Sequence, residues 1–392
     1  MLADLLTALT PKIAAFRRDI HAHPELAFDE HRTAEKVATY LDGLSGLGLE
    51  VHRGLAKTGV VARLKLGTSR RSIGLRADMD ALPLQEMNGF PHRSKHAGRM
   101  HACGHDGHTA MLLGAVEALC TLRGFDGTVV FIFQPAEEHE GGGRVMVEEG
   151  LFERFPMDMI FGLHNWPGLP AGHFGVTDGP VMAGADRFDI VVTGRGGHAA
   201  LPHQAIDTVL AASALVQALQ SLVSRSTDPL DAAVVSVTRF HAGHADNVLP
   251  ETAQLGGTVR TLTTQVQMQL EEGMRRICTG IEATYGVRIE LHYERGYPPT
   301  VNASSATAIA RAAAGAVVGE HAVQLNLRPS MGAEDFAYLA QCVPASYVWL
   351  GNGPTEGGCL LHSPHYDFND EVIATGIRYW VALARQVLGG ER

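Results

Sequence analysis

Residues 128–138 read TVVFIFQPAEE, an apolar run that is followed closely by two adjacent carboxylates. An unbroken apolar run of this length is typical of a strand that is buried on both faces of a sheet. Open α/β sheets bind their ligands just outside the carboxyl ends of the strands. The stretch therefore predicts an α/β fold, with a polar site that begins at Glu137 and Glu138.

Strands and helices alternate on both sides of this stretch, which favours a sheet covered by helices on both faces. The periodicities predict helices at 1–20, 30–44, 106–122 and 371–388, and strands at 60–66, 72–77, 128–133 and 159–163.

Polar side chains follow three of the expected strands. Asp80, Glu138 and His164 each come shortly after the end of a different strand. Three strands that deliver carboxylate and imidazole groups to one edge indicate a functional site rather than a solvated loop.

A different order of elements occupies the middle of the chain. It is β-α-β-β-α-β, which is typical of a ferredoxin-like unit that can fold alone. The expected elements are strands at 187–193, 232–240, 252–261 and 287–293 and helices at 205–222 and 265–285. We therefore expect a discontinuous catalytic domain of residues 1–181 and 299–392, interrupted by an inserted domain of residues 182–298.

Composition excludes several classes of protein. The chain has 392 residues, of which 45% are hydrophobic, and a net charge of −10, which argues against a nucleic-acid-binding protein. No apolar segment is long enough to span a membrane. The five cysteines are scattered without a disulfide framework, and the N-terminus lacks the pattern of a signal peptide, so we expect a cytoplasmic protein.

The segment His101-Ala102-Cys103-Gly104-His105-Asp106 is the first candidate for metal binding. Thiolate and imidazole groups are good ligands for divalent transition metals, and a tight loop before a helix would present both. A buried cysteine can equally be a small apolar residue of the core. The residues alone leave both interpretations open.

Two further segments have the same ambiguity. Glu137 and Glu138 would form a solvated loop, or else one would bind a metal ion while the other acted as a general base. His362, in the segment HSPHYDF, would lie in a polar loop, or else return to the site of His105 if the domain is interrupted.

At these residues the sequence closely resembles the M20 metallopeptidase superfamily. Within the superfamily it resembles the amidohydrolase branch, which includes hippurate hydrolases, N-acyl-amino-acid aminoacylases and plant auxin-conjugate hydrolases. The matching motifs cover residues 21–370 in the family's order and read HAHPELAFDE, GLRADMDALP, MHACGHDGH, FQPAEE, GLHNWP, GRGGHAALPH, DNVLPE, GGTVRTL, MGAEDFA and HSPHYDFND.

The resemblance implies a two-domain α/β protein, with a phosphorylase/hydrolase-like catalytic domain and an inserted ferredoxin-like α+β domain that serves as lid and dimerisation domain. It implies metal-dependent hydrolysis of the amide bond of N-acyl amino acids to a carboxylate and a free amino acid. A dipeptidase or carboxypeptidase of the same superfamily is the alternative. A binding protein that has lost catalysis is disfavoured by the intact Glu137, and a structural zinc protein by the dispersed ligands.

The resemblance also implies two divalent metal ions per subunit, with Zn, Mn, Co and Ni all compatible with the ligands. The family's ligands fall on Cys103 as the bridge, Glu138 and His362 for one ion, and His105 and His164 for the other. Glu137 matches the general base. Asp78 stands where other branches supply a histidine, so it is a doubtful ligand, and Asp80 is expected to orient a ligand.

In the inserted domain, His198 matches a residue that stabilises the oxyanion, often across a dimer. Asn247 and Arg260 match positions that hold the free carboxylate of the substrate, a role for which the planar guanidinium is suited. Gly332 and Glu334 match the wall of the substrate pocket. The resemblance thus implies a homodimer or larger homo-oligomer that acts on small N-acyl amino acids.

Overall fold

In the computed structural model of the chain, which describes residues 1–138 and 140–389, the apolar run forms strand β4 (Gly127–Gln134). All but one of its residues are buried. It lies inside an eight-stranded mixed sheet with the order β1-β2-β4-β3-β5-β16-β6-β15. The other strands are β1 (Leu49–Leu55), β2 (Gly59–Leu66), β3 (Ser72–Asp78), β5 (Met159–Pro167), β6 (Phe174–Val176), β15 (Val323–Leu325) and β16 (Ala345–Gly353).

Four neighbouring strands of this sheet run in the same direction. β3 pairs in parallel with β4 and with β5, and β5 pairs in parallel with β16. Their carboxyl ends therefore meet at one edge of the sheet, and this confirms the convergence expected from the sequence.

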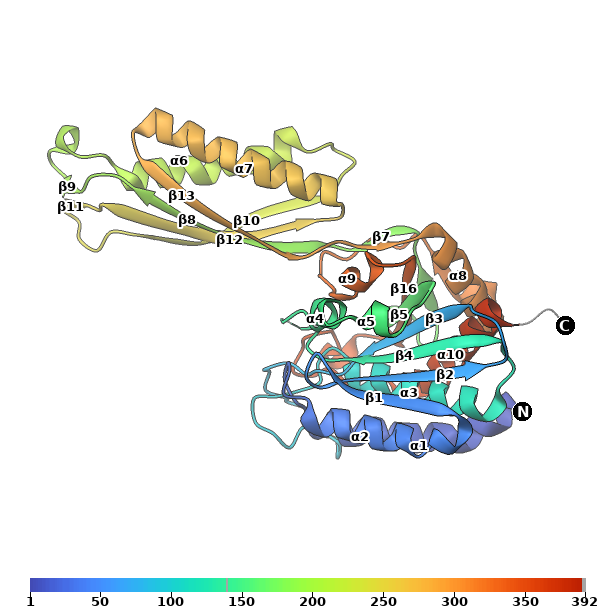
Figure 1. Ribbon diagram of the computed structural model, residues 1–392. Coiled ribbons are helices and arrows are strands. Elements are labelled where there is room, and N and C mark those ends of the chain that lie inside the picture. The colour runs from blue at the N-terminus through green and yellow to red at the C-terminus, as the bar shows by residue number, and fades with distance from the viewer. Residues whose placement is uncertain (139, 390–392) are drawn as a thin grey trace. The chain divides into compact units, whose positions relative to one another are not determined.

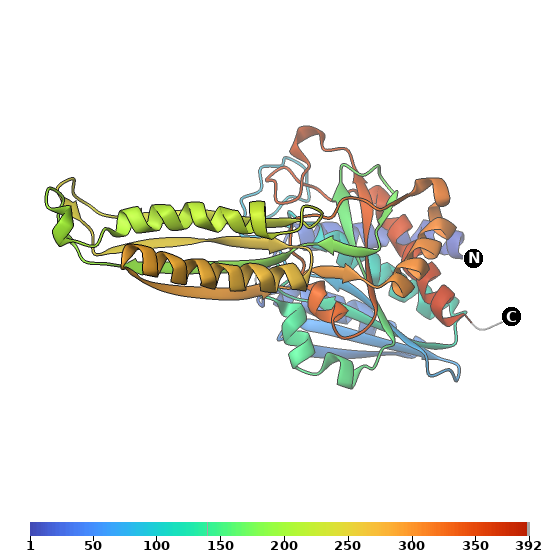
Figure 2. The same cartoon turned by 90° about the horizontal axis from the view of Figure 1, so that it is seen from above.

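Helices cover both faces of the sheet, as Figures 1 and 2 show. On one face lie α1 (Leu2–His21), α2 (His31–Asp42), α3 (His105–Leu122), α8 (Ser304–Val318) and α10 (Ile373–Leu388), and on the other lie the short α4 (Gly142–Glu148), α5 (Leu151–Arg154) and α9 (Phe336–Ala340). None of the described helices is both long enough and apolar enough to cross a membrane.

A four-stranded antiparallel sheet with the order β10-β12-β8-β13 forms the second part of the protein. Helices α6 and α7 pack on one of its faces (Figure 1). The elements are β8 (Gly184–Thr193), α6 (Thr208–Ser221), β10 (Ala233–Ala242), β12 (Thr252–Thr261), α7 (Thr264–Tyr285) and β13 (Arg288–Tyr297), with the short strands β9 (Gly197–His198) and β11 (Val248–Leu249). This confirms the ferredoxin-like order.

The chain divides into two compact units, which we describe separately. Unit 1 comprises residues 1–179, 301–328 and 335–392, and unit 2 comprises residues 180–300 and 329–334. Strands β7 (Gly179–Met182) and β14 (Thr300–Asn302) lie where the chain passes from one unit to the other.

One segment lies in a different unit from the one expected. The expected catalytic domain includes Gly332 and Glu334, whereas residues 329–334 belong to unit 2. The physical reason is backbone pairing, because Ser330 N–H donates to Val181, and Ala183 N–H donates to the carbonyl groups of Ser330 and Gly332.

Candidate metal centre

The carboxyl edge of the unit 1 sheet gathers the expected ligands from four segments. His164 lies within β5, and Glu138 follows β4 by four residues. Cys103 lies in the loop that leads into α3, and His105 is the first residue of that helix. The His362 N–H donates to the carbonyl oxygen of Ala102 over 2.8 Å, which ties the late loop to the segment that carries Cys103.

The five expected ligands form two groups that share Cys103. In each group the ligand atoms all lie within 4.8 Å of one another. The first group contains Cys103, His105 and His164, with 3.3 Å between Cys103 Sγ and His164 Nε2. The second contains Cys103, Glu138 and His362, with 3.3 Å between His362 Nε2 and Glu138 Oε1.

The surroundings of His105 indicate whether these residues fit a metal ion. Its Nε2 is buried and has no hydrogen-bond partner among the described residues. Carboxylate oxygens of Asp78 and Glu138 lie 3.8 Å from this nitrogen, and one of Glu137 lies 4.0 Å away. Two atoms bound to one tetrahedral ion lie roughly 3.3–3.7 Å apart. An unpartnered nitrogen that faces acidic oxygens at about this spacing fits a divalent cation.

In His105 and His164, the second ring nitrogen is already engaged. His105 Nδ1 lies 3.1 Å from Asp80 Oδ1, and His164 Nδ1 lies 2.7 Å from the carbonyl oxygen of Asn165. Such contacts fix the ring orientation and leave Nε2 directed at the cluster. Asp80 Oδ2 also accepts the Glu138 N–H over 2.9 Å, so one carboxylate orients two of the expected ligands.

Electrostatics at the cluster favour a cation. Burial lowers the pKa of His164 well below its usual range, which keeps the ring neutral, the form that binds metals. Against the effect of burial, Asp78 and Asp80 raise the pKa of His105 to about 10. Burial, followed by the charges of Glu138 and Glu137, raises the pKa of Cys103 well above its usual range. A bound cation would stabilise the thiolate instead.

Asp78 is engaged elsewhere, in keeping with the expectation that it is a doubtful ligand. Its Oδ2 accepts a hydrogen bond from Arg76 over 2.7 Å, and its Oδ1 lies 2.6 Å from His108 Nδ1. Both oxygens therefore already have strong partners.

Sequence reasoning missed Asp335, a fully buried neighbour of the expected base. Its N–H donates to Glu137 Oε1 over 3.3 Å, and its carboxylate accepts from Arg76 over 2.9 Å and from the Gly143 N–H over 2.7 Å. Asp335 lies in the motif MGAEDFA, directly after the expected pocket residue Glu334, and this motif is the signal that could have indicated it.

The expected lid residues lie in unit 2, and that unit does not bring them all together. His198 in β9 pairs with Val248 in β11, and the Asn247 carbonyl accepts the Ala199 N–H over 3.0 Å. These two strands form one end of the unit (Figure 1). Arg260, near the end of β12, pairs with Ala185 at the start of β8, at the opposite end.

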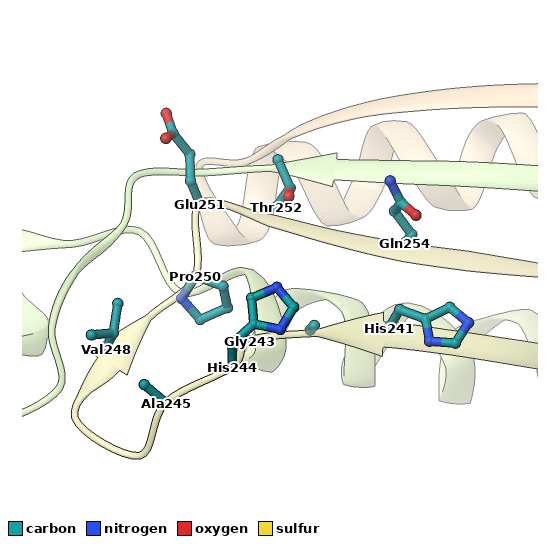
Figure 3. Close-up of a pocket in the computed structure, with 10 residues that line it drawn as sticks. His241, Gly243, His244, Ala245, Val248, Pro250, Glu251, Thr252 and Gln254 are labelled. Carbon is teal, nitrogen blue, oxygen red and sulfur yellow. The ribbon is translucent and has the colours of Figure 1, made fainter.

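Unit 2 also contains a pocket of about 440 Å³ between the end of β10 and the start of β12. Its lining includes His241, His244 and Glu251. Figure 3 shows the Glu251 carboxylate directed away from both rings, so these groups do not converge on a common point. None of the residues that line the pocket belongs to the metal-ligating groups found among the described residues.

A cluster of thiol, imidazole and carboxylate side chains at the carboxyl edge of an α/β sheet, in a chain with a ferredoxin-like insertion, is typical of two-domain metallohydrolases. The chain belongs to peptidase family M20/M25/M40, whose family profile matches residues 74–386.

Individual relatives agree with this assignment. The chain is 43% identical to the hippurate hydrolase of Campylobacter jejuni, over 95% of each chain, and 41% identical to an N-acetylcysteine deacetylase of Bacillus subtilis, over 97% of this chain and 98% of the relative. Its fold matches the crystal structure of a dinuclear metal-binding M20 peptidase from Bacillus subtilis with a TM-score of 0.85. That protein is 37% identical, and the match covers 97% of this chain and 99% of the other.

Proposed function

We propose that the chain is a metal-dependent amidohydrolase that cleaves N-acyl amino acids into a carboxylate and a free amino acid. The observation that carries the proposal is the pair of ligand groups sharing Cys103, with the Glu137 carboxylate beside them. The names of the relatives, hippurate hydrolase and N-acetylcysteine deacetylase, support the substrate class.

The cluster would hold two divalent ions. Cys103 would bridge them, Glu138 and His362 would complete the ligands of one, and His105 and His164 those of the other. When bound, such ions lower the pKa of a water molecule and polarise a carbonyl group. The Bacillus subtilis peptidase described as dinuclear metal-binding supports the number of ions.

Glu137 would act as the general base. Its side chain is almost fully buried, and its Oε1 accepts the Asp335 N–H, which restrains the carboxylate. Its Oε2 lies 4.0 Å from His105 Nε2, on the side of the ligand cluster. The carboxylate would take a proton from the attacking water and deliver it to the leaving nitrogen. Asp80 would keep His105 and Glu138 oriented.

In unit 2, His198 would stabilise the oxyanion, and Asn247 and Arg260 would hold the substrate carboxylate. Gly332 and Glu334 would line the substrate pocket. His198 and Asn247 lie at one end of this unit and Arg260 lies at the other, so one chain is poorly arranged to supply all three to one substrate. We therefore propose a homodimer in which His198 and Asn247 serve the partner's site.

A substrate panel tests the proposed activity. The chain, reconstituted separately with Zn, Mn, Co and Ni, would be assayed on hippurate, N-acetyl amino acids and unblocked dipeptides. We expect turnover of the acylated substrates that exceeds dipeptide turnover at least about tenfold in kcat/KM. Preferential cleavage of dipeptides would instead assign a dipeptidase. We also propose a cytoplasmic location, because all five cysteines are free thiols.

A further inference from the structure

The turn between β4 and the two glutamates has an unusual backbone. Ala136, which directly precedes Glu137, has φ of +54°. Residues with a Cβ rarely adopt this left-handed conformation, and they keep it only where surrounding contacts hold it. The direction in which Glu137 and Glu138 leave the strand therefore depends on whatever holds Ala136.

Glu30 supplies the contact at this point. Its Oε1 accepts the Ala136 N–H over 2.8 Å, and its Oε2 accepts the Thr58 hydroxyl over 2.7 Å. The residue is fully buried, and both of these partners are neutral groups. Burial, and then the charge of Asp80, raises the pKa of Glu30 to about 7. A buried carboxylate is unfavourable unless it is paired or hydrogen-bonded, so these two contacts are what stabilise Glu30 at this position.

The turn is also held on its other side. The Gly142 N–H donates to the Ala136 carbonyl over 2.9 Å, and a Cβ at Gly142 would collide with the carbonyl oxygen of Pro135. Beyond the turn, Asp80 accepts the Glu138 N–H. Glu30 and Asp80 thus restrain the backbone at successive points, one before and one after Glu137.

We propose that Glu30 is a positioning residue for the hydrolytic site. It holds the turn at Ala136 in the conformation that directs the Glu137 carboxylate and the Glu138 carboxylate toward the ligand cluster. It acts through the backbone of Ala136 and does not contact substrate. This inference rests on the proposed roles of Glu137 and Glu138.

The test compares Glu30→Gln with Glu30→Ala. A glutamine can accept the Ala136 N–H through its oxygen and donate to Thr58 through its nitrogen, so it preserves both hydrogen bonds without charge. Glu30→Ala removes both. We expect Glu30→Ala to lower kcat by roughly 10- to 100-fold with KM within about threefold, since misplacement of a catalytic group has effects of this size. Glu30→Gln should stay within about threefold of wild type.

Asp126→Ala is a matched control. Like Glu30, Asp126 accepts two hydrogen bonds, in this case from the N–H groups of Thr68 and Ser69, each over 2.7 Å, but it precedes the opposite end of β4. The Asp126→Ala variant should have lower stability than wild type and an unchanged kcat. Thr58→Val, which removes only the hydroxyl beside Glu30, is a milder variant should Glu30→Ala fail to fold, and should give a kcat between wild type and that expected for Glu30→Ala.

A second readout separates this inference from the proposed function. Glu30→Ala should weaken metal binding measured by titration, because Glu138 is displaced, whereas Glu30→Gln should not. If wild type hydrolyses none of the substrates, the proposed function fails, and the metal titration still tests the positioning. If wild type is active and Glu30→Ala matches Asp126→Ala in kcat and metal affinity, the positioning is wrong. Equal losses of kcat and metal affinity in Glu30→Gln and Glu30→Ala would also contradict the proposed positioning role.

Discussion

Each of the two buried histidines proposed as ligands uses one ring nitrogen for orientation and presents the other to the cluster. Asp80 engages His105, and the Asn165 carbonyl engages His164. Asp78 differs from these proposed ligands, because both of its oxygens are occupied by Arg76 and His108. At the scale of the residue, hydrogen bonding rather than residue type decides which groups remain available to a metal ion.

Glu137→Gln should separate metal binding from turnover. The amide has nearly the same shape as the carboxylate and can still accept the Asp335 N–H, but it cannot take a proton. We expect the variant to keep its metal content and lose roughly 10²- to 10⁴-fold in kcat. Elemental analysis and steady-state kinetics on one preparation would check this, and near-normal turnover would rule out Glu137 as the base.

His21 should make stability depend on pH. Burial disfavours its charge, but the Asp106 carboxylate, 2.8 Å from Nδ1, outweighs this effect and raises the pKa to about 9. A folded-state pKa above the unfolded value of about 6.5 contributes stability that is fully present below pH 6.5 and is lost as pH rises through 9. The contribution is on the order of 3 kcal/mol.

Urea unfolding of the metal-free protein between pH 6 and pH 9.5 would measure this effect. His21→Gln retains hydrogen-bonding capacity but does not titrate, so its stability should vary less across this range than that of wild type. Identical pH dependence in the two proteins would show that His21 is not charged in the folded state.

At the scale of the element, the start of α3 decides where Cys103 and His105 lie. Gly104, the residue before the helix, has φ of +97°, and a Cβ there would collide with the Asn165 side chain and the Tyr366 hydroxyl. Glycine is thus required at this position for two reasons: the backbone is left-handed, and there is no room for a Cβ. The turn at Gly104 thus allows Cys103 and His105, which are only two residues apart, both to reach the cluster.

Gly104→Ala should therefore lower the free energy of unfolding by about 2–4 kcal/mol, from left-handed strain plus the collision. Gly48→Ala is the control, since Gly48 has φ of +90° and no neighbour within 4 Å of the added Cβ, so only the strain remains. Urea unfolding would measure both variants. If the two variants lost equal free energy of unfolding, the close packing around Gly104 would be unimportant for stability.

The elements that the sequence predicts well are those with one dominant pattern. The apolar run at 128–133 and the strand at 252–261 emerged as expected. Strand β1, Leu49–Leu55, was missed because it is an edge strand in which only the two end residues are buried.

Residues of the candidate site were likewise predictable only where a local feature of the sequence indicated their role. The candidate ligands could be predicted because their side chains are of metal-binding types. Glu30 and Asp335 lie in the matching motifs HAHPELAFDE and MGAEDFA, but their roles could not be predicted, because they depend on contacts with residues 106 and 198 positions away, respectively.

At the scale of the whole molecule, the arrangement within unit 2 bears on assembly. Strand β12 has ten residues and therefore spans roughly 30 Å, with Arg260 near one end and the His198 strand beyond the other. A symmetric dimer would allow His198 of one chain to serve the site of the other.

Mixing two inactive variants tests this assembly. Glu137→Gln retains His198, and His198→Ala retains Glu137, so a mixed dimer has one complete site if His198 acts across the interface. Equimolar mixing with free exchange should recover about a quarter of wild-type activity. Each variant alone is the control, and a mixture no more active than the two separate proteins would mean that His198 acts within its own chain.

The central claim is that five side chains hold two metal ions with Cys103 shared between them. Elemental analysis of wild type and Cys103→Ser, reconstituted and dialysed side by side, tests it most directly. A neutral hydroxyl is a far weaker ligand than a thiolate. We predict two ions per wild-type chain and fewer than one in the variant. Two tightly retained ions in Cys103→Ser, or a single ion in wild type, would contradict the shared-ligand centre.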